Sequence, residues 1–468
     1  MHHTHHPRPR ALPGALPGAI AGTIAAGMIA AGMLALGLAL PAIAAAQPSA
    51  QGPVADSTPK PAAAQPALDS VTFQGEVRVR GEADRPGSGV RSDAFTLLRT
   101  RVGLTARAGG NARVMVQLQD SRAFGEEEST TDASADAIDL HQAWLELSGR
   151  WAASTVALRA GRQEIALGNE RLIGAVGWSN TGRSFDGARV DIRRASAPEG
   201  WSAMAFAATM RERGRRHGTL PDDVASAPDH LFGGIFATDG NVEGLVVHDR
   251  AGRFRTFADV DRTTGYVRFR TPAVGRVHFD LEGAYQLGDQ IPVAADGTLG
   301  AQQDVRAWFA GGRVVRQGSG LVPTMSLGAD WLSGDDDPAD ATYRAFNTLY
   351  ATNHKWYGFM DLFLDPAANT RDRGLVDAVL GASLPVSPIA TLRADAHGFW
   401  TAADGPGPGG ERWLGWELDL TMPVRVNAAS GLELGYSLFV PGPAGEAVGL
   451  GGDGNARHWG YAQLRVAF

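Results

Sequence analysis

The sequence contains no cysteine among its 468 residues. This absence excludes a disulfide scaffold, a thiolate metal site and a cysteine nucleophile. It fits a protein of the cell envelope that is built without disulfides, although many cytosolic proteins also lack cysteine. An excess of positive charge is missing too. The formal net charge is -7, which argues against a nucleic-acid binder that relies on bulk charge.

Amphipathic helices longer than a few turns are also missing once the N-terminal part of the chain is passed. The mean hydropathy of -0.14 is too polar for a helical membrane protein, but it suits a barrel with one polar face. The 60 glycines and 26 prolines are many for a helical enzyme. Length alone allows two or three soluble domains or one large closed barrel.

A long apolar run occupies the N-terminus, where residues 11–46 carry no charge and follow two arginines. Ala44 and Ala46 fit the two small positions of a signal-peptidase site. We therefore expect residues 1–46 to be a cleaved signal peptide. The alternative is a single membrane-spanning helix, for which the run is long enough. Residues 47–68 are rich in proline and alanine and lack periodicity, so we expect a disordered periplasmic leader.

Cleavage after Ala46 should leave a mature protein that begins at Gln47. Edman sequencing of the purified protein would show this N-terminus, and an intact Met1 would contradict it. The mature chain would carry 41 basic and 50 acidic residues, a net charge of -9.

From residue 69 onward, short segments alternate in hydropathy with a period of two and are separated by Gly, Asp, Pro and Asn. In VTFQGEVRVRGE, for example, Phe73, Val77 and Val79 share one face, opposite a face of polar and charged residues. Two architectures have such strands. A soluble sandwich or propeller packs its apolar face inward, whereas a transmembrane barrel turns that face to lipid and lines its lumen with the polar face.

The barrel accounts better for the charged residues at strand centres and for the signal peptide. The last segment, HWGYAQLRVAF, alternates Leu464, Val466 and Phe468 onto one face. It resembles the C-terminal strand that the assembly machinery of bacterial outer membranes recognises. At about 22 residues for each strand with its connection, residues 69–468 make about 18 strands. We expect an all-β, antiparallel transmembrane barrel of 18 strands, with 16 as the alternative, around an aqueous lumen.

Six segments, spread in order over nearly the whole mature chain, carry a family resemblance: LRTRVGL (98–104), QLQDSRAFGEE (117–127), DLHQAWLEL (139–147), the stretch 159–190, the stretch 332–363, and LGWELDL (414–420). They resemble the bacterial alginate-export family of outer-membrane porins. The resemblance implies an 18-stranded barrel over 69–468 that passes an anionic polyuronate through an arginine-lined constriction.

The residues themselves agree with an anion path. A polyuronate carries a carboxylate on every sugar, and arginine stays charged and can fork onto a carboxylate. In a narrow, partly desolvated place fixed cations attract anions more strongly than in water. Strand parity predicts these lumen-side arginines: Arg78, Arg80, Arg99, Arg101, Arg107, Arg189, Arg268, Arg270 and Arg393. The acids that share that side and would moderate the attraction are Glu76, Asp191, Asp280, Glu282, Asp395, Glu417 and Asp419.

The stretch 169–184, NERLIGAVGWSNTGRS, is too polar and glycine-rich to face lipid. We expect it to bend inward or to cap the strands, and to help form the constriction. The charged residues that it and its flanks would then bring into the lumen are Arg162, Arg171 and Arg183, with Glu164, Glu170 and Asp186. For each lumen arginine the alternative is an ion pair with an acid of the next strand that only stabilises the wall.

Other features favour plain structural roles. GDDDPAD (334–340) could bind Ca²⁺ through carboxylates, but it lacks the spacing of a helix-loop-helix site, and a solvated turn is the better prediction. His141 and His354 lack partners at metal-ligand spacing. The tryptophans could stack on sugars or form the interfacial girdle.

The sequence therefore predicts an outer-membrane channel, with no catalytic residue, metal or cofactor. Its cargo would be an anionic polysaccharide or small anions, and its partners outer-membrane lipid, the barrel-assembly machinery and periplasmic secretion scaffold proteins. Three alternatives stay open: a general porin for small anions, an outer-membrane polysaccharide-degrading enzyme, and an adhesion barrel with a plugged lumen. No nucleophile elbow, phosphate loop or zinc motif is present to support the enzyme.

Overall fold

The computed structural model describes residues 68–85, 92–124, 138–194, 200–211, 230–251, 259–293, 298–451 and 455–468. The expected signal peptide and all but the last residue of the expected leader lie outside the described residues.

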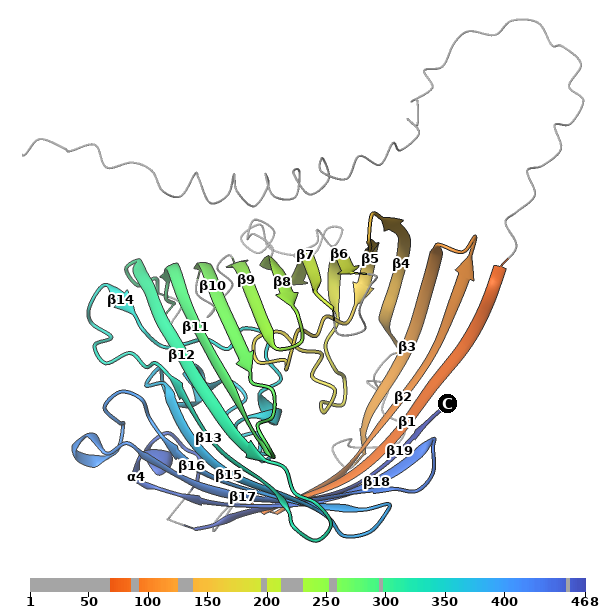
Figure 1. Cartoon of the computed structure of the whole chain (residues 1–468). Helices are drawn as coiled ribbons and strands as arrows, with labels where there is room; N and C mark the ends of the chain where they lie inside the picture. The colour runs from red at the N-terminus through yellow and green to blue at the C-terminus, as the bar shows by residue number, and fades with distance from the viewer. Residues whose placement is uncertain are drawn as a thin grey trace, which may run out of the picture. The chain divides into compact units, whose positions relative to one another are not determined.

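Within the described ranges, eighteen antiparallel strands form the wall of a closed barrel, each paired with its neighbours along the chain (Figure 1). The first half of the wall consists of β1 (Leu68–Arg85), β2 (Asp93–Ala108), β3 (Ala112–Phe124), β4 (Asp139–Trp151), β5 (Ser154–Gln163), β6 (Phe185–Arg194), β7 (Ser202–Arg211), β8 (His230–Thr238) and β9 (Val242–Ala251). The second half consists of β10 (Asp259–Arg270), β11 (Val277–Ile291), β12 (Gln303–Arg316), β13 (Thr324–Leu332), β15 (Leu375–Pro385), β16 (Thr391–Trp400), β17 (Trp413–Arg425), β18 (Ser430–Pro441) and β19 (Arg457–Ala467). The two-residue β14 (Thr342–Tyr343) pairs in parallel with β12. The predicted fold class and strand number are confirmed.

The alternating hydropathy of the sequence places apolar side chains on the exposed outer face of the wall and polar or charged side chains on its buried inner face. On β10, the outward Val267 and Phe269 are 59% and 44% exposed, whereas the inward Tyr266 and Arg268 are 6% and 8% exposed. A soluble sheet protein would bury the apolar set instead. A wall that exposes its apolar side chains and buries its charged ones is suited to lipid outside and polar contacts inside.

The C-terminal strand closes the barrel. β19 pairs with β1 in antiparallel register, with Leu464 opposite Val79. The terminal Phe468 exchanges two backbone hydrogen bonds with Gly75, of 2.7 and 3.0 Å. Closure leaves none of the described wall strands with an unpaired edge, as hydrocarbon surroundings require.

The two ends of the barrel differ in their connections. At one end tight turns join the strands, as at Gly240, whose φ of 94° suits glycine and whose neighbour Asp239 accepts hydrogen bonds from the backbone N–H groups of Asn241 and Val242. At the other end most connections are longer, as between β5 and β6 and between β13 and β15. Short turns are typical of the periplasmic side of such barrels and long loops of the outer side.

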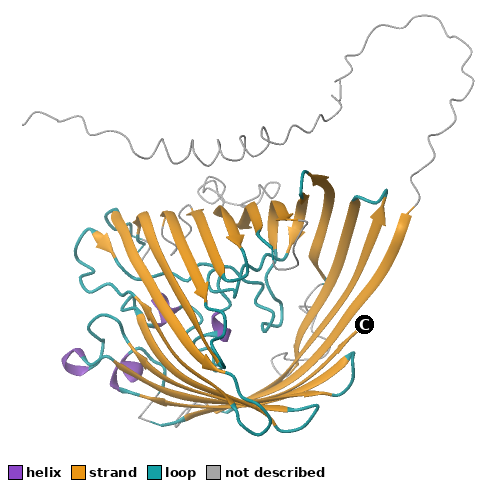
Figure 2. Cartoon of the chain, viewed as in Figure 1, coloured by secondary structure: helices purple, strands orange, loops and turns teal. Residues whose placement is uncertain are grey.

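Two of the long connections return into the barrel, where Figure 2 shows coil within the ring of strands. We call residues 164–184, between β5 and β6, the first inward segment, and residues 333–374, between β13 and β15, the second inward segment. The helices are short: η1 (Asn353–Lys355), α3 (Pro366–Asn369), η2 (Pro408–Gly410) and α4 (Pro443–Ala447). In the part of the chain that the structure describes, no helix is long and apolar enough to cross a bilayer.

A hydrophobic core binds both inward segments to the wall. Tyr357 and Phe363 of the second segment and Leu172 of the first are at most 2% exposed and belong to the same buried cluster as Phe185 and Phe399 on the strands. One side of the barrel interior is therefore packed like the interior of a globular protein.

Candidate functional site: the narrowed lumen

The two inward segments meet inside the barrel as a short parallel pairing. Ile173 bridges Tyr350, the N–H of Gly174 donates to the Tyr350 carbonyl at 2.9 Å, and the N–H of Tyr350 donates to the Leu172 carbonyl at 2.9 Å. The expectation that residues 169–184 bend inward is met by these contacts. The second inward segment, which the sequence did not predict to fold inside, is its partner.

Arg171 anchors this pairing to the wall. Its guanidinium donates to Glu282 on β11 at 3.0 Å and to Asp330 on β13 at 2.9 Å, and it lies 3.6 Å from the ring centroid of Trp356. Burial alone would lower the pKa of Arg171, but the charges of Asp330 and Glu282 outweigh burial and raise the pKa above its ordinary value. Arg171 is 2% exposed and neutralised by two carboxylates. It therefore holds the inward segments to the wall and is not exposed to water in the lumen.

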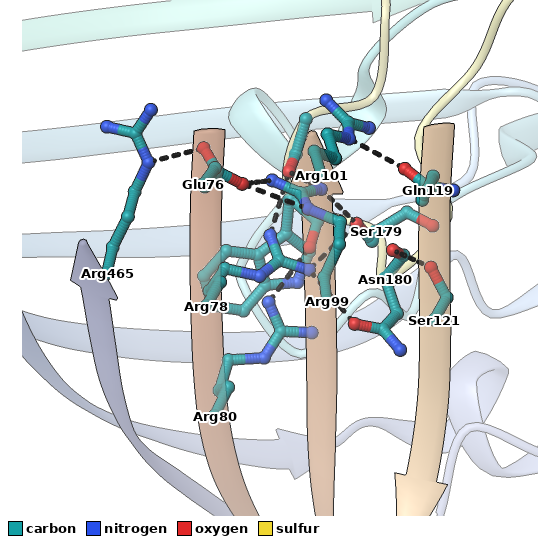
Figure 3. A network of polar contacts seen from close by, with 12 residues as sticks. Glu76, Arg78, Arg80, Arg99, Arg101, Gln119, Ser121, Ser179, Asn180 and Arg465 are labelled. Carbon is teal, nitrogen blue, oxygen red and sulfur yellow. Dashed lines mark hydrogen bonds and ion pairs between the residues drawn. The ribbon is translucent and has the colours of Figure 1, made fainter. Parts of the chain in front are cut away.

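On the opposite side, arginines of β1 and β2 clamp the turn of the first inward segment (Figure 3). Arg78 and Arg99 each donate to the carbonyl oxygens of Gly177 and Ser179, at 2.9 to 3.0 Å. Both arginines are nearly fully buried, at 3% and 4% exposure. Two guanidinium groups thus hold the turn, each through two hydrogen bonds. Hydrogen bonds from charged donors are stronger than those from neutral donors.

Arg80 completes this clamp. It donates to the Trp178 carbonyl at 2.9 Å, lies 3.8 Å from the Trp178 ring centroid, and pairs with Glu82 at 2.7 Å. His354 stacks on Trp178 with ring centroids 4.3 Å apart and an interplanar angle of 8°. Trp178 therefore already has both a cation and a second ring as neighbours, which leaves it poorly suited to stack on a sugar.

Next to the clamp, a chain of polar contacts runs from the wall to the first inward segment. Arg101 donates to Gln119 at 2.6 Å and to Glu164 at 3.3 Å, and Glu164 also bonds the ring of His141 at 2.7 Å. Burial alone would raise the pKa of the Glu164 carboxyl, but the hydrogen bond from His141 and the charge of Arg101 hold the pKa below its ordinary value. His141 thus has a carboxylate partner, and His354 has one as well, Asp361 at 2.7 Å.

Arg183 and Glu170 join the two inward segments. Arg183 donates to the carbonyl oxygens of Gly174, Tyr350 and Ala351. Glu170 accepts from Lys355 and from the Thr352 hydroxyl.

Several of the other predicted charges pair along the wall: Arg189 with Asp191 at 2.9 Å, Arg268 with Asp280 at 2.5 Å and with Glu243 at 3.2 Å, and Glu76 with both Arg99 at 2.6 Å and Arg465 at 2.7 Å. Arg162 pairs with Asp186 at 2.6 Å at the ends of β5 and β6. In the strand alternation these two residues fall in step with the outward Leu158 and Val190, and out of step with the inward Arg159 and Arg189. The sequence grouped this pair with the lumen charges because it placed the switch from strand to inward segment only approximately. The two side chains nevertheless line a hollow together with Gln119, His141 and Thr181.

Three predicted arginines lie at strand ends and contribute nothing to the clamp. Arg107, Arg270 and Arg393 are exposed. Arg270 donates to the Gly240 carbonyl.

The predicted acids of β16 and β17 form a separate patch. Glu417 and Asp419 are 0% and 1% exposed. They accept hydrogen bonds from the backbone N–H groups of Met360 at 2.9 Å and Phe359 at 3.3 Å. Asp395 lies on the same face of the neighbouring strand. Glu417 and Asp419 therefore dock the second inward segment to the wall.

The sequence missed several charged residues of the interior, among them Asp330, Arg313, Asp377 and His397. Asp330 bonds both Arg171 and Arg313, the latter at 2.8 Å, and His397 bonds Asp377 at 2.9 Å. The signal was available for Asp330, because TMSLGADWL alternates with a period of two and its polar positions give Asp330 an inward place. RAWFAGGRVVR has arginines on both faces, so its pattern does not single out Arg313.

The acidic loop 334–340 lies against an arginine. Arg344 is within ion-pair distance of Asp335, Asp336 and Asp340, at 3.6, 3.7 and 2.8 Å. Across the described ranges, no three His, Cys, Asp or Glu side chains are grouped so that they could hold a metal ion.

Comparisons with known proteins bear on this barrel and its inward segments. The family model described as alginate export matches residues 69–364. Among solved structures, the chain is similar to Acinetobacter baumannii OccAB4, with a TM-score of 0.55, 8% identity, and coverage of 86% of this chain and 98% of that one. It is similar to OccAB1 of the same organism, with a TM-score of 0.53, 13% identity, and coverage of 86% of this chain and 97% of that one. It is also similar to a BenF-like porin from Pseudomonas fluorescens Pf-5, with a TM-score of 0.52, 10% identity, and coverage of 86% of this chain and 100% of that one. At these identities the likeness establishes the fold alone. No curated protein sequence matches the chain.

The family match covers well over half of the chain, from β1 through the whole first inward segment and into the second. This barrel is therefore an outer-membrane channel protein of the alginate export family.

Proposed function

We propose that the barrel passively conducts an anionic polysaccharide of the polyuronate class, such as alginate, and that arginines at its narrowed part select the cargo. One observation carries the proposal. Arg78 and Arg183 donate to carbonyl and amide oxygens and have no carboxylate within ion-pair distance among the described residues. Their charges are not neutralised locally, so they give the narrowed lumen a positive potential that attracts anions.

The nearby acids limit how tightly an anion is held. Glu76 lies between Arg99 and Arg465, and Glu164 lies beside Arg101. A polymer must leave each cation as it advances, and conduction requires binding that is weak enough for release. Alternation of paired and unpaired arginines meets both requirements.

The packed interior favours a second candidate, a porin for small anions. Both inward segments are fixed to the wall by buried contacts, at Arg171 on one side and at Glu417 on the other. A fixed narrowing passes small solutes without rearrangement, whereas a polymer must thread through it. Block by a polymer that enters the lumen distinguishes the two candidates.

Single-channel recording in a planar bilayer tests the proposal. We expect a reversal potential that favours anions under a salt gradient, and interruptions of the current that grow with the concentration of a short oligouronate. A neutral oligosaccharide of matched length is the control. Anion preference without interruptions would support the small-anion porin instead, and cation preference would contradict both.

Neutralising Arg183 should lower the anion preference. Arg183→Gln removes a charge that has no carboxylate within ion-pair distance among the described residues, so the reversal potential should move toward the non-selective value. Arg171 is offset by Glu282 and Asp330, and its effect on selectivity should come only through movement of the inward segments. An unchanged reversal potential in Arg183→Gln would count against a role in selection.

We further propose that partners are the barrel-assembly machinery, which would engage the C-terminal strand β19, and periplasmic scaffold proteins of a secretion complex. The proposal needs no bound cofactor and no chemical step.

A further inference from the structure

A group of arginines surrounds the mouth of the barrel at the end where the short turns lie. Each lies at or within three residues of a strand end, in an inward position of its strand, with an exposed side chain. We call them the mouth arginines: Arg107, Arg150, Arg193, Arg270, Arg393 and Arg425.

Strand pairing fixes their inward direction. Arg107 follows the alternation of the buried Arg99 on β2. Arg150 of β4 and Arg193 of β6 are both in register with Thr155 of β5, so they flank the same strand on the same face. An inward position keeps these side chains away from the lipid that surrounds the wall, which argues against lipid phosphates as their ligand.

The charges of the mouth arginines are not neutralised. None of them is in an ion pair with a residue that the structure describes. Arg270 donates to the carbonyl of Gly240, and Arg425 donates to that of Pro388 at 3.3 Å. Three inward acids of the next layer already have arginine partners: Glu146 with Arg113 and Arg159, Asp191 with Arg189, and Asp280 with Arg268. Asp395, two residues from Arg393, interacts with it electrostatically but is not in an ion pair with it.

The opposite end of the barrel has the reverse character. Acids predominate among the exposed charged residues near its strand ends and loops, including Asp93, Asp139, Asp259, Asp304 and Asp336. The potential therefore falls along the barrel axis from a basic mouth to an acidic one. Short turns are typical of the periplasmic side, so the basic mouth faces the periplasm.

We propose that the mouth arginines form a loading site that captures a polyanion from the periplasmic side before it reaches the narrowed lumen. This inference rests on the proposed function and adds a second, separate set of arginines to it. The clamp arginines are buried and bonded to the first inward segment, whereas the mouth arginines are free to meet cargo. A ring of fixed cations raises the local concentration of a polyanion and the rate of its capture, and does so most at low salt.

The test measures how fast an oligouronate blocks the channel current when it is added to one side of a bilayer or to the other. The chain has no cysteine, so Ala273→Cys in the turn between β10 and β11 gives a single thiol at the basic mouth. An impermeant thiol reagent is added to one chamber after the recording. Reaction with the introduced thiol shows that the basic mouth faced that chamber. We expect faster block from the basic mouth, and a further variant, Arg107→Gln with Arg150→Gln and Arg193→Gln, should slow it by roughly tenfold at low salt.

A matched control neutralises three exposed arginines of the other end, Arg85, Arg306 and Arg371, and should leave block from the basic mouth unchanged. Equal block from both sides, unaffected by the mouth variant, would overturn the loading site while leaving the channel function intact. Absence of both block and anion preference would instead overturn the proposed function itself. Block that is slowed equally from both sides would also overturn the loading site, because it would place the lost charges in the common path.

Discussion

Replacing Arg171 with methionine should release the inward segments from the wall and raise the current through the channel. Methionine keeps an apolar contact with Trp356 but leaves Glu282 without its cation and Asp330 with Arg313 alone. Removing one partner of a buried ion pair costs about 3–5 kcal/mol, because the remaining charge stays buried without a partner. That cost falls on the local docking of the segments, since the strand ladders of the barrel do not involve Arg171.

A specific protease can detect this release. The sequence contains two lysines, Lys60 in the expected leader and Lys355 in the second inward segment. A lysine-specific endoprotease should cleave Arg171→Met after residue 355, whereas the native protein should resist there, because its backbone is held in η1 between buried neighbours. The same samples should show a larger single-channel current.

Two control variants separate lost charge balance from general damage. Arg171→Met combined with Glu282→Gln removes the stranded charge, so its cleavage should be slower than that of the single variant. Arg306→Gln breaks an ion pair whose side chains are more than 60% exposed, and should cost at most about 1 kcal/mol. Native resistance and native current in Arg171→Met would mean that the hydrophobic core alone holds the segments.

The sequence predicted the wall better than the contents of the lumen, and the reason is physical. Each wall strand obeys a local rule, the alternation of faces, so residues such as Val267 and Arg268 can be assigned from their neighbours. The interior obeys no local rule. Arg171 bonds Glu282 and Asp330, which lie more than 100 residues away in the chain, and nothing in the period-two pattern selects these partners.

The character of the first inward segment was predictable, but its role was only partly so. Its glycines and charges are unsuited to lipid, which correctly indicated an inward path. The sequence suggested that its arginines and those of β1 and β2 would all line the constriction. In the structure Arg78 and Arg99 serve the segment itself by binding its carbonyl oxygens. A sequence pattern does not indicate which backbone carbonyl oxygens accept hydrogen bonds from side chains, so these contacts of Arg78 and Arg99 could not be predicted.

Replacing both Arg78 and Arg99 of the clamp should also have a large effect, lowering the anion preference and changing the current. Arg78→Gln with Arg99→Gln leaves the carbonyl oxygens of Gly177 and Ser179 without their charged donors. A hydrogen bond from a charged donor contributes about 1.5–3 kcal/mol, so the loss of all four should detach the turn from the wall. The variant also removes two positive charges while Glu76 remains, so the anion preference should fall.

Single variants and a lysine substitution distinguish the clamp from the charge. Because both arginines serve the same two carbonyl oxygens, either single glutamine variant keeps one fork, and the effect of the double variant should exceed the sum of the two. Arg78→Lys keeps the charge but cannot fork onto two oxygens. It should preserve the reversal potential while the current becomes noisier as the turn moves. If Arg78→Lys lost anion preference as fully as Arg78→Gln, the selectivity would depend on the position of the turn, and the unpaired charge of Arg78 would not be what selects anions.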